Sequence, residues 1–226
     1  MTINLIDVSA TDAMVARAAR VSTIGKDSAA ADLPTKGLIN FLMRDRHGSP
    51  FEHNSMTFYV HAPMVVFWQM VRHRAGWSYN LESGRYKELS PEFYVPEKSR
   101  PLVQVGKAGA YEFVQGDDTL HDVAMRELMN AYEAAWDSYQ NMLKAGICRE
   151  IARLPLGFGI YFSGYVTCNS RSLMHFLSLR TKNDDAQVKS SPQFEINAVA
   201  DQLEDEWAKH MPVTHAAFVK HGRVAP

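Results

Sequence analysis

Three arginines, a histidine and several hydrogen-bonding side chains are concentrated between Arg72 and Tyr86, in the stretch RHRAGWSYNLESGRY. The segment before it, Pro63 to Val71, is apolar nearly all the way round. Charge at the end of a buried element is costly without a counter-charge, so we expect an anionic ligand here. Arginine forks match phosphate oxygens, and Ser83-Gly84 offers a hydroxyl and an accessible backbone N–H. The stretch predicts a phosphate-binding loop, the alternative being a solvated basic loop.

A second cluster is the stretch NSRSLMHFLSLR, from Asn169 to Arg180. On a helix, Arg171 and His175 are neighbours four residues apart, and Arg180 falls near the apolar face. Arg180 is either a snorkelling side chain or an arginine aimed into a cavity. Arg149 and Arg153 form a similar pair, for which surface charge is the simple alternative.

The stretch HGSPFEH, from His47 to His53, contains two histidines and a glutamate. No regular element places that spacing on one face, so we predict a turn and no metal. The chain has no evident Ser-His-Asp triad, no cysteine beside a histidine, and neither G-x-G-x-x-G nor G-x-x-x-x-G-K-[ST]. Anion binding without a protein nucleophile suggests that a bound cofactor performs the chemistry.

Composition favours one domain over residues 1–226. The 226 residues are 46% hydrophobic and carry a net charge of -1, which argues against nucleic-acid coating or a polybasic membrane role. Cys148 and Cys168 lack disulfide-framework or zinc spacing. The first residues do not read as a signal peptide, and no apolar run is long enough to span a membrane. We therefore expect a cytoplasmic protein.

The elements that must position these residues follow from periodicity and capping signals. We predict an α+β fold in which a central mixed β-sheet is flanked by helices. The expected strands are Ile3–Val8, Ser55–Ala62 and Gly157–Cys168, with a short extended piece at Phe93–Val95 in a loop-rich region from Gly76 to Pro101. In the first part of the chain, the expected helices run from a Ser9 cap to Val21, from Asp32 and Pro34 toward Gly48, and from Pro63 to the first cluster. In the second part they cover Asp117–Gly146, Arg149–Leu154, an Asn169 cap to Arg180, Phe194–Met211 and Val213–His221. The expected loops are Gly25–Ala31 and Thr181–Pro192.

Six stretches of the chain, taken together, resemble the ordered landmarks of the flavin-dependent thymidylate synthase (ThyX) family. They are RHR, SYN, SGRY, HGSPFEH, Ala152-Arg153 and NSRSLMHFLSLR. The resemblance extends from about Arg20 to Val219. It implies reductive C5 methylation of dUMP to dTMP, with 5,10-methylenetetrahydrofolate as carbon donor, NADPH as reductant and FAD as hydride carrier. It also implies an α+β homotetramer with active sites at subunit interfaces, and no nucleic-acid or membrane partner.

The resemblance carries roles to matching positions. Arg180 would be the catalytic residue, an electrostatic stabiliser of the N3-ionised uracil. The implied FAD contacts are Ser49, Glu52, Arg72, His73, Arg74, Asn80, Asn169, Arg171 and His175. The implied nucleotide contacts are Gln69, Arg72, Glu82, Ser83, Gly84, Arg85, Arg153 and Arg180. His47 and Tyr86 would line the entrance for folate or nicotinamide.

Two departures from the family pattern leave the substrate open. Eight residues separate Arg74 from Ser83, one more than is usual, and Thr181 to Pro192 resembles an insertion. Some relatives in nucleoside-antibiotic pathways methylate UMP, and tolerating one extra hydroxyl costs little energy, so a UMP/dUMP methylase is the first alternative. The second alternative is a non-catalytic nucleotide or RNA binding module that stacks bases on Tyr79 and Tyr86.

Overall fold

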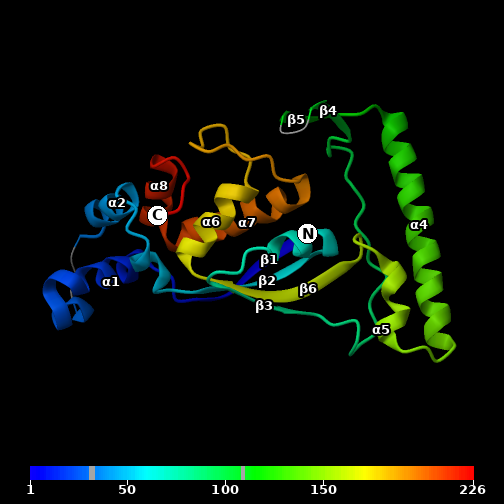
Figure 1. Cartoon of the computed structure of the whole chain (residues 1–226), viewed down its shortest axis with the longest axis horizontal. Helices are drawn as coiled ribbons and strands as arrows, with labels where there is room; N and C mark the ends of the chain where they lie inside the picture. The colour runs from blue at the N-terminus through cyan, green and yellow to red at the C-terminus, as the bar shows by residue number, and fades with distance from the viewer. Residues whose placement is uncertain (31–33, 108–109) are drawn as a thin grey trace. The chain divides into compact units, whose positions relative to one another are not determined.

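Figure 1 shows the computed structural model, which describes residues 1–30, 34–107 and 110–226. The strands are β1 (Thr2–Val8), β2 (Met56–Pro63), β3 (Trp77–Leu81), β4 (Val103–Lys107), β5 (Ala110–Val114) and β6 (Tyr161–Cys168). The α-helices are α1 (Asp12–Ile24), α2 (Lys36–Arg44), α3 (Met64–Met70), α4 (Asp118–Lys144), α5 (Arg149–Ala152), α6 (Ser170–Arg180), α7 (Phe194–His210) and α8 (Pro212–Lys220). Short 3-10 turns are η1 (Gly25–Ala30), η2 (Ser49–Glu52) and η3 (Leu154–Leu156).

The main sheet has the strand order β1-β2-β6-β3, and β4 and β5 form a separate antiparallel pair. The predicted α+β fold is therefore confirmed. The sheet is antiparallel rather than mixed where side-chain pairs report its direction, because Thr57 faces Thr167 while His61 faces Ser163. Residue patterns predict strands but not which neighbours they choose, so strand direction was the weak part of the prediction.

The backbone divides into two compact units, each assembled from separate stretches of chain. Unit 1 comprises residues 1–60, 69–80 and 164–226, and unit 2 comprises 61–68 and 81–163. In unit 1, α7 packs against α6, α8 and β1 around fully buried Phe176 and Trp207. In unit 2, α4 lies beside α5, as Figure 1 shows, and Tyr139 is its fully buried residue. The single-domain interpretation remains a prediction.

In strand β2, the alternation of residue types in the sequence matches the alternation of buried and half-buried side chains. Met56, Phe58 and Val60 are fully buried, whereas Thr57 and Tyr59 between them are half-buried. Successive side chains of a strand point to opposite faces, so alternation in the sequence becomes one core face and one polar face. The predicted strands at Ser55–Ala62 and Ile3–Val8 are confirmed within one residue as β2 and β1, whereas the strand predicted at Gly157–Cys168 begins four residues later, at Tyr161 of β6.

Helix α1 begins two residues later than predicted. Thr11, not Ser9, is its N-cap and accepts a hydrogen bond from the Met14 N–H at 3.2 Å. Ser9 instead lies against Ser55, with its N–H donating to the Ser55 carbonyl at 2.9 Å. Asp12 accepts hydrogen bonds from the N–H groups of residues 213 and 214 at 2.9 and 2.8 Å, and so caps α8 rather than its own helix. Ser9 and Asp12 therefore each bind a partner that is distant in sequence, which the local capping pattern does not indicate.

The boundaries of other helices, strands and loops also differ from the predicted ones. Much of the expected loop at 25–31 is the 3-10 turn η1, and the second helix is α2, which ends at Arg44 before Gly48 is reached. Asp32 and residue 31, which the predictions included, lie outside the described residues. The loop-rich region after Gly76 contains β3, and Phe93 forms a single bridge with Ile160.

The long helix and the C-terminal elements were predicted correctly within a few residues. Asp117 caps α4 by accepting from the Leu120 N–H at 2.9 Å, and Asn169 caps α6. Apolar residues of α4 that fall at helical spacing, such as Leu128, Trp136 and Leu143, are half-buried, whereas Tyr139 is fully buried. Among the described residues, no helix combines the length and apolar character that crossing a membrane requires.

Candidate functional site

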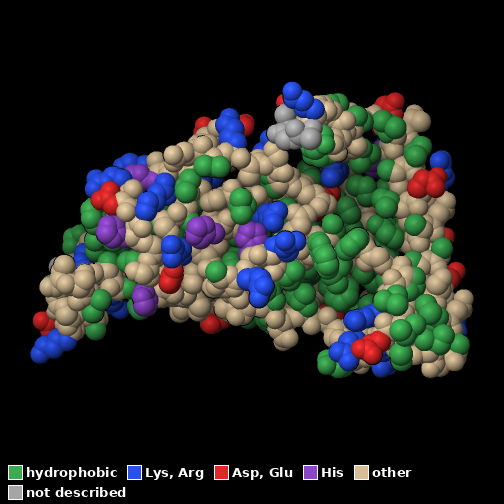
Figure 2. Space-filling model, in the orientation of Figure 1, with side chains coloured by type: hydrophobic (Ala, Val, Ile, Leu, Met, Phe, Trp, Pro, Cys, Tyr) green, Lys and Arg blue, Asp and Glu red, His purple; other side chains and the backbone are tan. Residues whose placement is uncertain are grey.

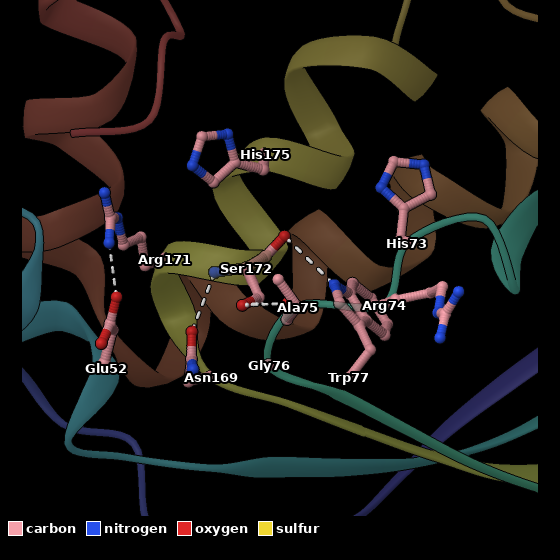
Figure 3. A pocket seen from close by; sticks show the side chains of 10 residues that line it. All are labelled: Glu52, His73, Arg74, Ala75, Gly76, Trp77, Asn169, Arg171, Ser172 and His175. Carbon is pink, nitrogen blue, oxygen red and sulfur yellow. Dashed lines mark hydrogen bonds and ion pairs between the residues drawn. The ribbon is translucent and has the colours of Figure 1, made fainter.

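A pocket of about 600 Å³ opens in unit 1 between the start of α6 and the segment that follows α3 (Figure 3). Its wall carries cationic and hydrogen-bonding groups from three stretches that are distant in sequence. The lining residues are Glu52, His73, Arg74, Ala75, Gly76, Trp77, Asn169, Arg171, Ser172 and His175. Figure 2 shows Lys, Arg and His side chains gathered on the face where Figure 1 places α6.

The floor of the pocket is fixed by the cap of α6. The Asn169 side chain accepts from the Ser172 N–H at 2.9 Å, and the Ser172 hydroxyl donates to the Ala75 carbonyl at 2.8 Å. Gly76 has a φ of 69°, and a Cβ there would lie 2.1 Å from the Ser172 Oγ. Only glycine allows the backbone after Arg74 to approach the helix cap this closely. The glycine of RHRAG therefore shapes the pocket.

Arg171 is oriented by partners on two sides. Its Nη1 donates to Glu52 Oε1 at 2.5 Å, and its Nε donates to the Pro226 carbonyl at 2.7 Å. Gly48 leaves room for the guanidinium, because a Cβ at that position would lie 2.5 Å from Arg171 Cζ. Both members of the ion pair are more than a third exposed, so the pair contributes little to stability and serves mainly to aim Arg171.

Arg180, at the end of α6, contacts His73 rather than solvent alone. Arg180 Nε donates to His73 Nε2 at 3.1 Å, and Nη1 donates to Gln69 Oε1 at 3.2 Å. Burial lowers the pKa of His73 to about 4, and the charges of Arg180 and His175 act in the same direction. His73 is therefore neutral near pH 7, accepts at Nε2 and carries its proton on Nδ1.

Aromatic side chains hold the His73 segment from behind. The ring of His73 meets that of Phe176 edge-on at 4.8 Å, and Trp77 stacks on Tyr79 at 5.9 Å. The Tyr79 hydroxyl lies 2.6 Å from the Met70 carbonyl and 3.0 Å from that of His73, and burial raises its pKa. Tyr79 is thus a hydrogen-bond donor that joins the end of α3 to the segment that carries His73.

In unit 2, the segment from Ser83 to Tyr86 forms a turn, in which the Tyr86 N–H donates to the Ser83 carbonyl at 3.1 Å. Glu82 accepts from the Ser163 N–H at 3.2 Å and pairs with Lys87 at 2.7 Å. The Ser83 Oγ accepts from the Arg85 N–H at 3.3 Å. Gly84 is buried, and a Cβ there would come within 3.3 Å of Arg153 Cδ. Glycine thus lets this turn pack against Arg153, bringing together two of the predicted nucleotide contacts.

The structure brings most of the predicted cofactor contacts into one pocket. Six of the predicted contacts line this pocket, namely Glu52, His73, Arg74, Asn169, Arg171 and His175. The other three, Ser49, Arg72 and Asn80, are exposed and do not line it. His47, predicted at the entrance, stacks on Phe41 at 5.4 Å, and Tyr86 is 79% exposed. The assigned roles remain predictions.

Sequence reasoning missed four lining residues, Ala75, Gly76, Trp77 and Ser172. The glycine directly after RHRA and the serine three residues after the Asn169 cap were the available signals. No set of three or more His, Cys, Asp or Glu side chains within the described ranges could hold a metal ion.

Comparison with known proteins decides the family. Residues 4–213 match the Thy1 family model, described as thymidylate synthase complementing protein. The chain belongs to the flavin-dependent thymidylate synthase family. A family member from Streptomyces coelicolor is 55% identical over 230 residues, which cover 100% of this chain and 94% of that protein. Another from Tropheryma whipplei is 49% identical, covering 100% and 95%.

Solved structures of a related enzyme are also similar. The UMP/dUMP methylase PolB from Streptomyces cacaoi, bound with 5-Br dUMP, has a TM-score of 0.95 and 53% identity, covering 100% of this chain and 97% of that chain. The same enzyme bound with 5-Br UMP has a TM-score of 0.92. The family resemblance stated from the motifs is therefore confirmed, and the chain is an enzyme of that family.

Proposed function

We propose that this protein is a flavin-dependent thymidylate synthase that methylates dUMP at C5, with FAD held in the pocket of unit 1. The observation that carries the proposal is the convergence of six predicted cofactor contacts on that pocket, in a chain 55% identical over its full length to a flavin-dependent thymidylate synthase. NADPH as reductant and 5,10-methylenetetrahydrofolate as carbon donor complete the proposed reaction.

The donor set of the pocket fits a dinucleotide cofactor. Arg74 and Arg171 supply positive charge for a diphosphate, and the one lining carboxylate, Glu52, is already paired with Arg171. The Nδ1–H of neutral His73 is available as a donor, and Gly76 keeps backbone within reach of a ligand. When bound, the flavin would carry hydride to the pyrimidine, so the chain needs no nucleophile of its own.

Arg180 would act on the nucleotide by charge rather than by bond formation. A guanidinium stays protonated in proteins, and its contacts to His73 and Gln69 hold it in one orientation before substrate binds. A preorganised cation favours the N3-ionised pyrimidine. The proposed nucleotide contacts in unit 1 are Gln69, Arg72 and Arg180, and those in unit 2 are Glu82, Ser83, Gly84, Arg85 and Arg153.

The state of the cysteines supports chemistry without sulfur attack. Cys168 is 2% exposed, and burial raises the pKa of its thiol. A protonated, enclosed thiol is a poor nucleophile. Cys168 thus serves as a small apolar residue of the core, and the proposed route is reduction by flavin.

A homotetramer with active sites at subunit interfaces is part of the proposal. Its support is apolar surface on unit 2, where Trp68 and Phe158 are 60% and 59% exposed and meet edge-on at 6.0 Å. Large exposed aromatic side chains in contact with each other are typical of interaction surfaces. Light scattering should give four times the 25.5 kDa chain mass, and a monomer would refute the assembly.

The activity has a direct test. The purified protein should show flavin absorption and oxidise NADPH when dUMP and methylenetetrahydrofolate are both present, with dTMP as product. Arg74→Ala should lower flavin retention, whereas Arg126→Ala, on an exposed face of α4, should leave it unchanged. A colourless protein that cannot be reconstituted with FAD would refute the proposal.

A UMP/dUMP methylase is the second candidate, favoured by the likeness to PolB at a TM-score of 0.95. Comparing kcat/KM for UMP and dUMP decides between the two, since a strong preference for dUMP excludes the second. A nucleotide or RNA binding module would bind single strands with steep salt dependence and show no turnover.

A further inference from the structure

Gln193, which no motif singled out, links to the proposed catalytic arginine through one side chain. The Gln193 Oε1 accepts a hydrogen bond from Gln69 Nε2, while Gln69 Oε1 accepts from Arg180. Arg180 in turn donates to His73. These bonds form one chain from Gln193 to His73, which lines the pocket.

The direction of this chain is set at Arg180, whose guanidinium can only donate. A side-chain amide has a donor end and an acceptor end, and rotating it by half a turn exchanges them. Because Arg180 donates, the Gln69 oxygen must face it, and the Gln69 nitrogen then faces Gln193, whose Oε1 accepts. Without Gln193, the Gln69 nitrogen would lose this acceptor, and the Gln69 amide would be free to move away from the guanidinium.

The two ends of the 181–192 segment meet at Gln69. Arg180 is the last residue of α6, and Gln193 is the N-cap position of α7, where its side chain makes no cap hydrogen bond. The segment is closed at its base, where the Ser190 hydroxyl donates to the Thr181 carbonyl at 2.8 Å. The amide of Gln193 is thus committed to Gln69 rather than to the helix it begins.

We propose that Gln193 is a positioning residue, which fixes the Gln69 amide and thereby the aim of Arg180 and the tautomer of His73. This inference rests on the proposed function for its catalytic consequence, but the geometry of the chain stands without it. Arg180 and His175, both on α6, are the charged or titratable groups that act on His73. Loss of the Arg180 contact would therefore let His73 titrate at higher pH.

The test uses Gln193→Asn, which keeps a favourable N-cap residue for α7 but is one methylene too short to reach Gln69. Gln193→Met is the second variant, with similar length and no acceptor oxygen. Gln202→Met is the matched control, because within the described part of the chain the Gln202 amide donates to Ala198 of its own helix and not to the pocket. Nitrogen-15 NMR of the ligand-free protein reports the tautomer and titration of His73.

We expect His73 to titrate at higher pH in both Gln193 variants and to be unchanged in the control. In the active enzyme, kcat should fall about tenfold, with the KM for nucleotide changed less than about threefold, as for a misdirected preorganised donor. In a Gln69→Leu background, Gln193→Asn should add nothing further. Unchanged His73 titration and kcat would overturn the proposal. An inactive wild type would refute the proposed function, while the NMR result would still decide the role of Gln193.

Discussion

Replacing Gly76 by alanine should damage both stability and cofactor retention, for two separable reasons. The first is backbone strain, because φ is 69° and a side chain in the left-handed region costs about 1–2 kcal/mol. The second is collision, because the new Cβ would lie 2.1 Å from Ser172 Oγ and 2.7 Å from Asn169 Nδ2. Relieving it requires Ser172 to give up its bond to Ala75, at about 1 kcal/mol.

The two contributions sum to about 2–3 kcal/mol of unfolding free energy. For a chain of this length, that corresponds to a fall of about 4–12 °C in Tm. Gly146→Ala is the matched control, since Gly146 has a φ of 82° but no atom within 4 Å of a Cβ, so only the strain remains.

Urea denaturation would measure the free energies of unfolding, and absorption after gel filtration would measure retained flavin. We expect Gly76→Ala to be about 1 kcal/mol less stable than Gly146→Ala and to lose flavin, which the control keeps. Equal stability of the two variants with full flavin retention would show that the close approach at Gly76 does not shape the pocket.

The remaining predictions concern three polar side chains. Arg180→Lys cannot make both of the bonds to His73 and Gln69, so kcat should fall by about tenfold or more; an unchanged kcat contradicts the role of Arg180. Burial would raise the pKa of Glu204, but hydrogen bonds from His215 and Arg223 prevail and lower it from 4.5 to about 2. That carboxylate should therefore contribute up to about 3 kcal/mol at neutral pH, lost as pH falls from 4.5 toward 2, and Glu204→Gln should flatten this dependence in denaturation curves. Tyr79→Phe removes the hydroxyl that lies within hydrogen-bonding distance of the Met70 and His73 carbonyls, and should cost about 1–3 kcal/mol in unfolding free energy, whereas Tyr165→Phe should cost much less.

Elements whose signals are local could be predicted from the sequence. Asp117 and Asn169 cap the helices that they precede, and the alternation of residues 56–62 gave β2. The strand at Trp77–Leu81 also alternates, but the charges around it suggested a loop. The choice between Ser9 and Thr11 as a cap could not be made locally, because it depends on Ser55.

In the candidate site too, some residues could be located from the sequence and others could not. The family resemblance of the motifs located six pocket residues that are far apart in the chain. The sequence could not reveal which partner aims each group. Gln193 and Gln69 are 124 positions apart, and nothing in either neighbourhood predicts their contact.

The enclosed Cys168 has a practical consequence for inhibitor design. A thiol-directed warhead would find that side chain inaccessible and protonated, and would label exposed Cys148 instead. Compounds that depend on covalent trapping by an enzyme sulfur should therefore leave turnover intact. Under the proposed function, effective blockers would be anionic competitors for the pocket that Arg74 and Arg171 line.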